Sequence, residues 1–153
     1  GEAADAAAAA LCSVWHGRGS AQPYMFGHGR RFKRVKWPPM WYDAFTVLDA
    51  LSLWPRAWDS RPENEGKRQA VCELAACLVA YNFGPDGLVT PRSCYRGFED
   101  YSWGQKKQPS PLATAMACVI LRRLEPLVPQ IAAVDVRKLG SSRGGTGVPL
   151  PPD

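Results

Sequence analysis

The sequence has little that would tie it to a membrane, a metal or an oxidising compartment. Its longest apolar run, from Leu112 to Leu121, is about ten residues, whereas roughly 18 are needed to span a bilayer. The five cysteines are odd in number and show no C-x-x-C spacing. Cys12 and His16 lie one helical turn apart, but no second ligand pair follows. We therefore predict a cytoplasmic protein without a transmembrane segment, a metal or a cofactor.

The cysteines divide into two groups by their surroundings. Cys94 lies among aromatic and basic residues, where neighbouring arginines would lower its pKa if it were exposed. The others sit in apolar helical patterns, which predicts small buried core residues at Cys12, Cys72, Cys77 and Cys118.

Strand patterns are also missing, since no segment alternates apolar and polar residues with period two. The 153 residues instead hold apolar stripes of helical period at 5–16, 40–53, 67–81 and 111–124, with a shorter piece at 127–134. With 46% hydrophobic content, this predicts one all-α domain over residues 1–135. The Gly/Pro-rich tail at 136–153 is predicted to be disordered.

The best-marked stretch of the chain runs from residue 84 to residue 124. Gly84-Pro85-Asp86-Gly87 has the residues that a type I turn favours. Ser110 is placed as the N-cap of the last long helix, and Pro111 suits its first position. Between these points aromatic residues alternate with basic ones: Arg92, Tyr95, Arg96, Phe98, Tyr101, Trp103, Lys106 and Lys107. Such a segment either contacts a ligand or packs over a neighbouring helix pair.

Positive charge is concentrated in one place. The net charge is +5, and five of the seven residues from Arg30 to Lys36 are basic. A local patch of this kind attracts phosphates, acidic lipid headgroups or an acidic partner. The alternation of aromatic residues with Lys and Arg also resembles a surface on which single-stranded nucleic acid stacks. The alternative is a solvated loop that keeps the protein soluble.

The two halves of the chain share a plan. Each has an apolar helix, a long aromatic and basic loop, a Lys shortly before Pro, and a second apolar helix. Lys36-Trp37-Pro38 in the first half corresponds to Lys107-Gln108-Pro109 in the second. Repeated helix pairs bury their apolar faces by stacking, which predicts antiparallel pairs of an α/α-toroid or solenoid type.

The segment D-G-L-V-T-P at residues 86–91, followed by F-E-D-Y-S-W-G-Q-K-K at 98–107 and the helix at 111–124, resembles the repeat of the prenyltransferase and squalene-cyclase superfamily. The chain is similar to bacterial proteins that carry such repeats, over residues 25–124. The resemblance implies an α/α fold and an apolar, isoprenoid-type ligand. The acidic D-x-D-D motif of the cyclases is absent, and neither His16 nor His28 falls in a segment that matches the zinc site of the transferases. The chain opens without Met, which is consistent with a fragment of a longer protein.

The candidate ligand-binding residues come from both loops. Four aromatic side chains could line an apolar pocket: Trp37, Trp41, Tyr42 and Trp103. Two lysines, Lys106 and Lys107, could bind an anionic head group at its mouth. Asp43 is the acid nearest this group and could donate a proton if burial raised its pKa. The alternative is that the tryptophans belong to the core, that Asp43 serves the first turn of a helix, and that the lysines pair locally with Glu99 or Asp100.

These features predict a binding module for an apolar or isoprenoid-type ligand with an anionic head. One alternative is a fragment of a terpenoid cyclase or prenyltransferase. Another is a module that binds an acidic macromolecule through the run from Arg30 to Lys36.

Overall fold

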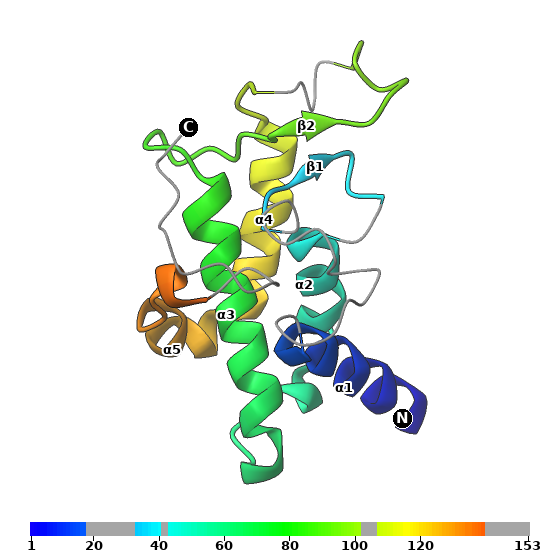
Figure 1. Cartoon of the computed structure of the whole chain (residues 1–153), viewed down its shortest axis with the longest axis vertical. Helices are drawn as coiled ribbons and strands as arrows, with labels where there is room; N and C mark the ends of the chain where they lie inside the picture. Colours follow the sequence, from blue (N-terminus) through cyan, green and yellow to red (C-terminus); the bar gives the residue numbers. More distant parts are fainter. Residues whose placement is uncertain (18–32, 41–42, 102–106, 140–153) are drawn as a thin grey trace.

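Helices make up most of the protein, whose computed structural model describes residues 1–17, 33–40, 43–101 and 107–139 (Figure 1). The main elements are α1 (Glu2–His16), β1 (Lys36–Trp37), α2 (Ala44–Ser52), α3 (Glu65–Asn82), β2 (Ser93–Cys94), α4 (Pro111–Arg123) and α5 (Val128–Ala132). Short 3-10 turns lie between or after them: η3 (Pro55–Ala57), η4 (Pro62–Asn64), η5 (Glu125–Leu127) and η6 (Val136–Lys138). The prediction of a dominantly helical protein is confirmed. A two-residue parallel strand pair, which the sequence pattern did not indicate, is added to it.

Helix α3 is the centre of the core. It packs against α1, α2 and α5, and Figure 1 shows it running between them. Every residue at positions 70–78 is buried, as expected for a segment that is nearly all apolar after Glu73. Small side chains such as Ala70 and Ala75 let the neighbouring helices approach closely.

A buried carboxylate joins α1 to α3. Glu73 Oε2 accepts a hydrogen bond of 2.6 Å from the indole Nε1 of Trp15, although the two residues are 58 positions apart. Gln69, one turn earlier on α3, donates to the other oxygen of Glu73 at 2.9 Å. Burying a charged group is costly unless donors surround it, and these two donors meet that need.

The helix starts follow local capping chemistry. Ser110 caps α4 by accepting a hydrogen bond from the Ala113 amide, and Pro111 is the first residue of α4, as predicted. The predicted start of the second long helix at Met40 is wrong, because α2 begins only at Ala44. Asp43 occupies the N-cap with an extended backbone, which sets the beginning of the helix.

The predicted reversal after α3 is confirmed. The Gly87 amide donates to the Gly84 carbonyl at 3.0 Å, and Gly87 has a φ of +74°, a value that glycine adopts without strain. The returning chain reaches Val89, whose amide donates to Thr114 Oγ1 at 2.8 Å. The Val89 carbonyl accepts from the Ser110 amide at 2.9 Å, so the start of α4 is held against this turn.

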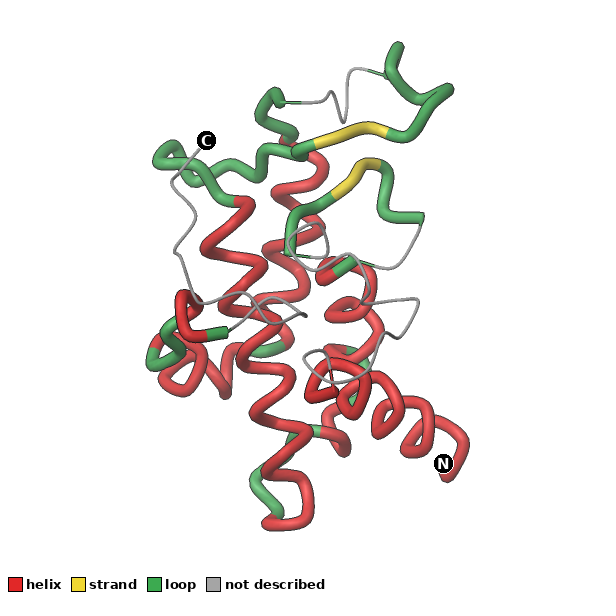
Figure 2. Tube along the Cα trace, viewed as in Figure 1, coloured by secondary structure: helices red, strands yellow, loops and turns green. Residues whose placement is uncertain are grey.

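The start of α2, the end of α3 and the start of α4 all lie at one end of the molecule, beside the paired strands (Figure 2). Asn82, the last residue of α3, forms the joint between this helix and the loop that carries β1. Its Oδ1 accepts from the Val35 amide at 2.7 Å, and its Nδ2 donates to the Lys33 carbonyl at 2.9 Å. The side chain therefore pairs with the loop backbone as a neighbouring strand would, and it holds residues 33–37 against α3.

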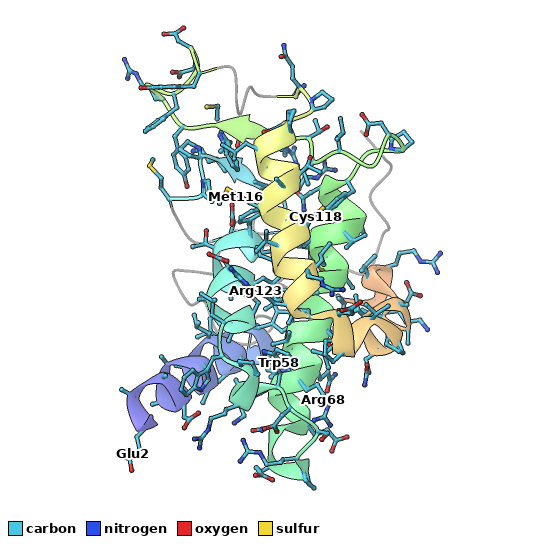
Figure 3. All side chains as sticks on the ribbon, turned by 180° about the vertical axis from the view of Figure 1, so that it is seen from behind. Glu2, Trp58, Arg68, Met116, Cys118 and Arg123 are labelled. Atoms are coloured by element: carbon cyan, nitrogen blue, oxygen red, sulfur yellow. The ribbon has the colours of Figure 1, made fainter. Side chains whose placement is uncertain are left out.

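Helix α4 is covered on one side only (Figure 3). It buries Ala113, Ala117 and Ile120, whereas Cys118 and Val119 are exposed. The prediction that Cys118 is a buried core residue is therefore wrong. Apolar residues of α4 lie on its exposed face as well as on its covered face, so composition alone did not distinguish the two faces.

The packed body continues to Leu139, four residues beyond the predicted boundary at 135. Val136 and Leu139 pack against the core, and η6 contacts α3. The Leu139 carbonyl accepts a hydrogen bond of 2.8 Å from Lys33 Nζ, which ties the last described residue to the loop before β1. Most of the predicted tail, residues 140–153, lies outside the described part of the chain.

Candidate ligand-binding site

The two aromatic and basic loops meet through their backbones. Strands β1 and β2 pair in parallel, with Lys36 opposite Ser93 and Trp37 opposite Cys94. The Val35 carbonyl accepts from the Arg92 amide at 3.1 Å, and the Trp37 carbonyl accepts from the Tyr95 amide at 2.9 Å. Parallel pairing needs no local turn, so it joins segments that are distant in sequence.

This pairing places a cation on an aromatic ring. Lys36 Nζ lies 3.8 Å from the centroid of the Tyr95 ring, well within the range of a cation–π interaction. Burial raises the pKa of Tyr95, and the negative charge of Asp43 raises it further, so the phenol is neutral at physiological pH. The site therefore presents a positive charge beside a neutral aromatic surface.

Asp43 connects β1 to α2. Its Oδ1 accepts from the Phe45 amide at 3.0 Å, from the Thr46 amide at 3.1 Å and from Thr46 Oγ1 at 3.3 Å. Its Oδ2 accepts from the Lys36 amide at 3.1 Å. Burial raises the pKa of this carboxyl, although the hydrogen bonds, which favour the charged form, oppose that rise. The geometry is that of a helix N-cap, one position before the first-turn site that the sequence suggested as the alternative for Asp43.

Trp37 is almost fully enclosed, with 2% of its surface exposed. Among the described residues, its indole Nε1 is a buried side-chain nitrogen with no hydrogen-bond partner. The Trp37–Pro38 peptide bond is cis. The residue thus belongs to the core and also carries an unused donor at the paired loops.

The described residues contain three of the predicted site residues. Trp37 and Asp43 lie together at β1, and the Lys107 amide donates to the Pro91 carbonyl at 2.8 Å, just before β2. Lys107 is exposed and has a left-handed backbone with φ of +60°, which is uncommon for a residue with a side chain. The remaining predicted ligand-binding residues lie outside the described part of the chain: Trp41, Tyr42, Trp103 and Lys106.

Part of the basic run from Arg30 to Lys36 is buried in the fold. Lys33 is buried, with Nζ bonded to the Leu139 carbonyl and 5.5 Å from the centroid of the Tyr81 ring. The charged end of Lys33 therefore contacts groups within the fold and does not contribute to a basic outer surface. Within the described part of this run, which begins at Lys33, Lys36 is the lysine that lies at the paired loops; Arg30 and Arg31 are not described.

Sequence reasoning did not select Tyr95 as a site residue, although the structure places it under Lys36. The available signal was its position in the aromatic loop directly after Cys94. Cys94 itself is half-buried, and burial raises the pKa of its thiol, with Glu99 adding to the rise. A reactive thiolate at Cys94 is therefore disfavoured near neutral pH.

Three further observations bear on function. No protein-family model, curated protein or solved structure matches this chain significantly. The described residues hold no group of three or more His, Cys, Asp or Glu side chains that could bind a metal ion. In the same part of the chain, every helix is too short or too polar to cross a bilayer.

Proposed function

We propose that this chain is a ligand-binding module of the α/α helical-repeat type, similar in plan to the prenyltransferase and squalene-cyclase repeats. Its ligand is an apolar or isoprenoid-type molecule with an anionic head. The site lies where β1 and β2 pair, beside the start of α2, the end of α3 and the start of α4. The repeat architecture is of the toroid or solenoid kind, in which further helix pairs would stack on the exposed face of α4.

One observation carries the proposal. The pairing of two distant loops brings the Lys36 ammonium over the Tyr95 ring. If the two loops served only to keep the protein soluble, they would not need to pair through their backbones or to join a lysine of one loop to an aromatic ring of the other. A site with aromatic walls and a cation at its edge suits a ligand with an apolar chain and a negatively charged head.

The cyclase or transferase alternative depends on Asp43 as an acid. Donating a proton requires Asp43 to be protonated, and a protonated carboxyl accepts fewer hydrogen bonds from the amides that it now caps. This arrangement favours binding over proton transfer. If a product forms from an isoprenyl diphosphate, and Asp43→Asn abolishes it while binding is retained, the enzyme alternative replaces our proposal.

Binding is tested with geranyl and farnesyl diphosphate, by tryptophan fluorescence and by thermal unfolding. Saturation at 100 times Kd stabilises the folded protein by about 2.7 kcal/mol, which raises Tm by roughly 5–10 °C for a chain of this size. Lys36→Ala should weaken diphosphate binding and reduce its dependence on salt, because one charge at the head group is lost.

Lys138→Ala is the matched control, since this lysine is 85% exposed on η6 and should leave binding unchanged. Heparin serves as the probe for the acidic-macromolecule alternative. A thermal shift with heparin and none with any isoprenoid would transfer the function to the basic surface. The absence of quenching and of thermal shift with both isoprenoids would refute the proposal.

A further inference from the structure

The outer face of the strand pair carries three polar side chains. Successive side chains of a strand point to opposite faces, and residues directly opposite each other in a pair share a face. Because Trp37 is buried, Lys36 points to the outer face, as does Ser93, its partner in register. Tyr95 follows Ser93 by two positions, and its ring lies under the Lys36 ammonium, so it shares this face. Lys36, Ser93 and Tyr95 are each half-buried and keep access to solvent.

These side chains hold hydrogen-bond donors that the fold does not use. An ammonium has three N–H donors, and each hydroxyl has one. Among the residues that the structure describes, no oxygen accepts from Lys36 Nζ, Ser93 Oγ or Tyr95 Oη, and Lys36 forms no ion pair. The charge of Asp43 reaches Tyr95, but the oxygens of Asp43 already accept from three amides and the Thr46 hydroxyl. Burial raises the pKa of Tyr95, so its hydroxyl keeps the proton that it can donate.

A second lysine–tyrosine pair shows the contrast. Lys33 Nζ lies 5.5 Å from the centroid of the Tyr81 ring, and it donates to the Leu139 carbonyl at 2.8 Å. Lys33 is buried, whereas Lys36 is half-buried. The charge of the first pair is therefore used within the fold, and the charge of the second is presented on the outer face.

The number of donor groups indicates the class of head group that would suit this face. A carboxylate has two oxygens in one plane, whereas a phosphoryl group has three strong acceptor oxygens that point in different directions. A lysine binds such a group as a point charge. One ammonium and two hydroxyls on the same face therefore match a phosphoryl group better than a carboxylate.

We infer that the head group of the ligand is a phosphoryl group that accepts hydrogen bonds from Lys36 Nζ, Tyr95 Oη and Ser93 Oγ on the outer face of β1 and β2. This inference rests on the function proposed above and names the class of anion at that site. It gives Tyr95 two roles, because its ring holds the ammonium and its hydroxyl contacts the ligand.

The first test is Tyr95→Phe, which removes the hydroxyl and keeps the ring under Lys36. Tm should change by less than about 2 °C, because no hydrogen bond to a described residue is lost. Affinity for geranyl diphosphate should fall about 10-fold, the effect of one hydrogen bond to a charged group. The salt dependence of binding should stay as in the wild type, since the charge of Lys36 remains.

Tyr81→Phe is the matched control, because the Tyr81 ring lies under the buried Lys33, and it should leave the affinity unchanged. A large decrease in the Tm of Tyr95→Phe would mean that the hydroxyl is used within the fold, and would overturn the inference. Equal affinity of Tyr95→Phe and the wild type for geranyl diphosphate would also overturn it.

The second test compares geranyl diphosphate with geranic acid, which has the same carbon skeleton and a carboxylate head. The wild type should bind the diphosphate more tightly. When Tyr95→Phe and Ser93→Ala are combined, the ratio of the two Kd values should shrink about 10-fold, because the phosphoryl group loses two hydrogen bonds and the carboxylate, with one oxygen on Lys36, loses one. An unchanged ratio would refute the phosphoryl assignment and leave the proposed function standing. If the wild type binds neither probe, both fail.

Discussion

Replacing Asn82 with Ala tests the joint between α3 and the loop that carries β1. The substitution removes the acceptor of the Val35 amide and the donor to the Lys33 carbonyl, both at buried positions. A buried amide left without a partner costs about 1–3 kcal/mol, and the lost hydrogen bond to the carbonyl adds about 1 kcal/mol. We therefore expect Asn82→Ala to lower the free energy of unfolding by about 2–4 kcal/mol.

Asn64 offers a matched control at the opposite end of α3. It is also buried, and its Nδ2 donates to the Arg56 carbonyl at 2.8 Å and to Asp59 Oδ1 at 2.6 Å. Arg61 donates to both of these acceptors, so neither is left unpaired when Asn64 is truncated. Asn64→Ala should therefore cost only about 1 kcal/mol.

Urea unfolding provides the measurement. With a slope of about 2 kcal/mol per molar urea, Asn82→Ala should shift the midpoint by roughly 1–2 M, and Asn64→Ala by about 0.5 M. Amide hydrogen exchange at Val35 should accelerate in Asn82→Ala, because the loop loses its anchor. If Asn82→Ala costs no more than Asn64→Ala, the role of Asn82 as the joint is refuted.

Asn82→Asp separates the acceptor from the donor function. The carboxylate can still accept from the Val35 amide, but it faces the carbonyls of Lys33 and Leu78, to which Asn82 Nδ2 now donates. This repulsion raises the pKa of the introduced carboxyl in the folded state, so the variant should gain stability relative to Asn82→Ala as the pH falls. A constant difference between the two variants from pH 7 to pH 4 would contradict this account.

Two further predictions concern pH and thiol reactivity. Hydrogen bonds from Arg61 and Asn64 lower the pKa of Asp59 to about 2, so its contribution to stability is complete above the unfolded value near 3.8 and is lost as the pH falls toward 2. Asp59→Asn should lower Tm at pH 6 and weaken the loss of Tm on acidification, whereas Asp100→Asn at an exposed position should do neither. For the thiols, Ellman's reagent should modify exposed Cys118 rapidly in the native protein. The thiols of the three buried cysteines should react only on unfolding: Cys12, Cys72 and Cys77. Rapid reaction of any of them in the native protein would contradict the packing.

Local chemistry alone predicted much of the helical framework. The Ser110 cap, the first-turn Pro111 and the reversal at Gly84 and Gly87 depend on interactions within a few residues, so they could be found in the sequence. The burial of α3 followed from its almost continuous apolar run. The start of α2 was misplaced because apolar periodicity extends to Met40, and the capping geometry of Asp43 decides the boundary instead.

The exposure of Cys118 depended on the tertiary structure. Helix α4 has apolar residues on several faces, and only those that face α2 and the hydrophobic core are covered. A sequence pattern shows that such a helix can be buried, but the number of neighbouring helices decides how much of it is.

The sequence by itself marked Trp37, Asp43 and Lys107 as residues of interest, but it left open whether they lie together. The structure decides this through contacts between distant positions: Val35 meets Asn82 47 positions later, and Lys33 meets Leu139 106 positions later. Tyr95 comes under Lys36 because β1 pairs with β2, and Asp43 at the start of α2 and Asn82 at the end of α3 both hold the loop that carries β1. Each of these contacts depends on how the helices pack, since no local turn or cap links the two residues involved, and for that reason no short stretch of sequence encodes them.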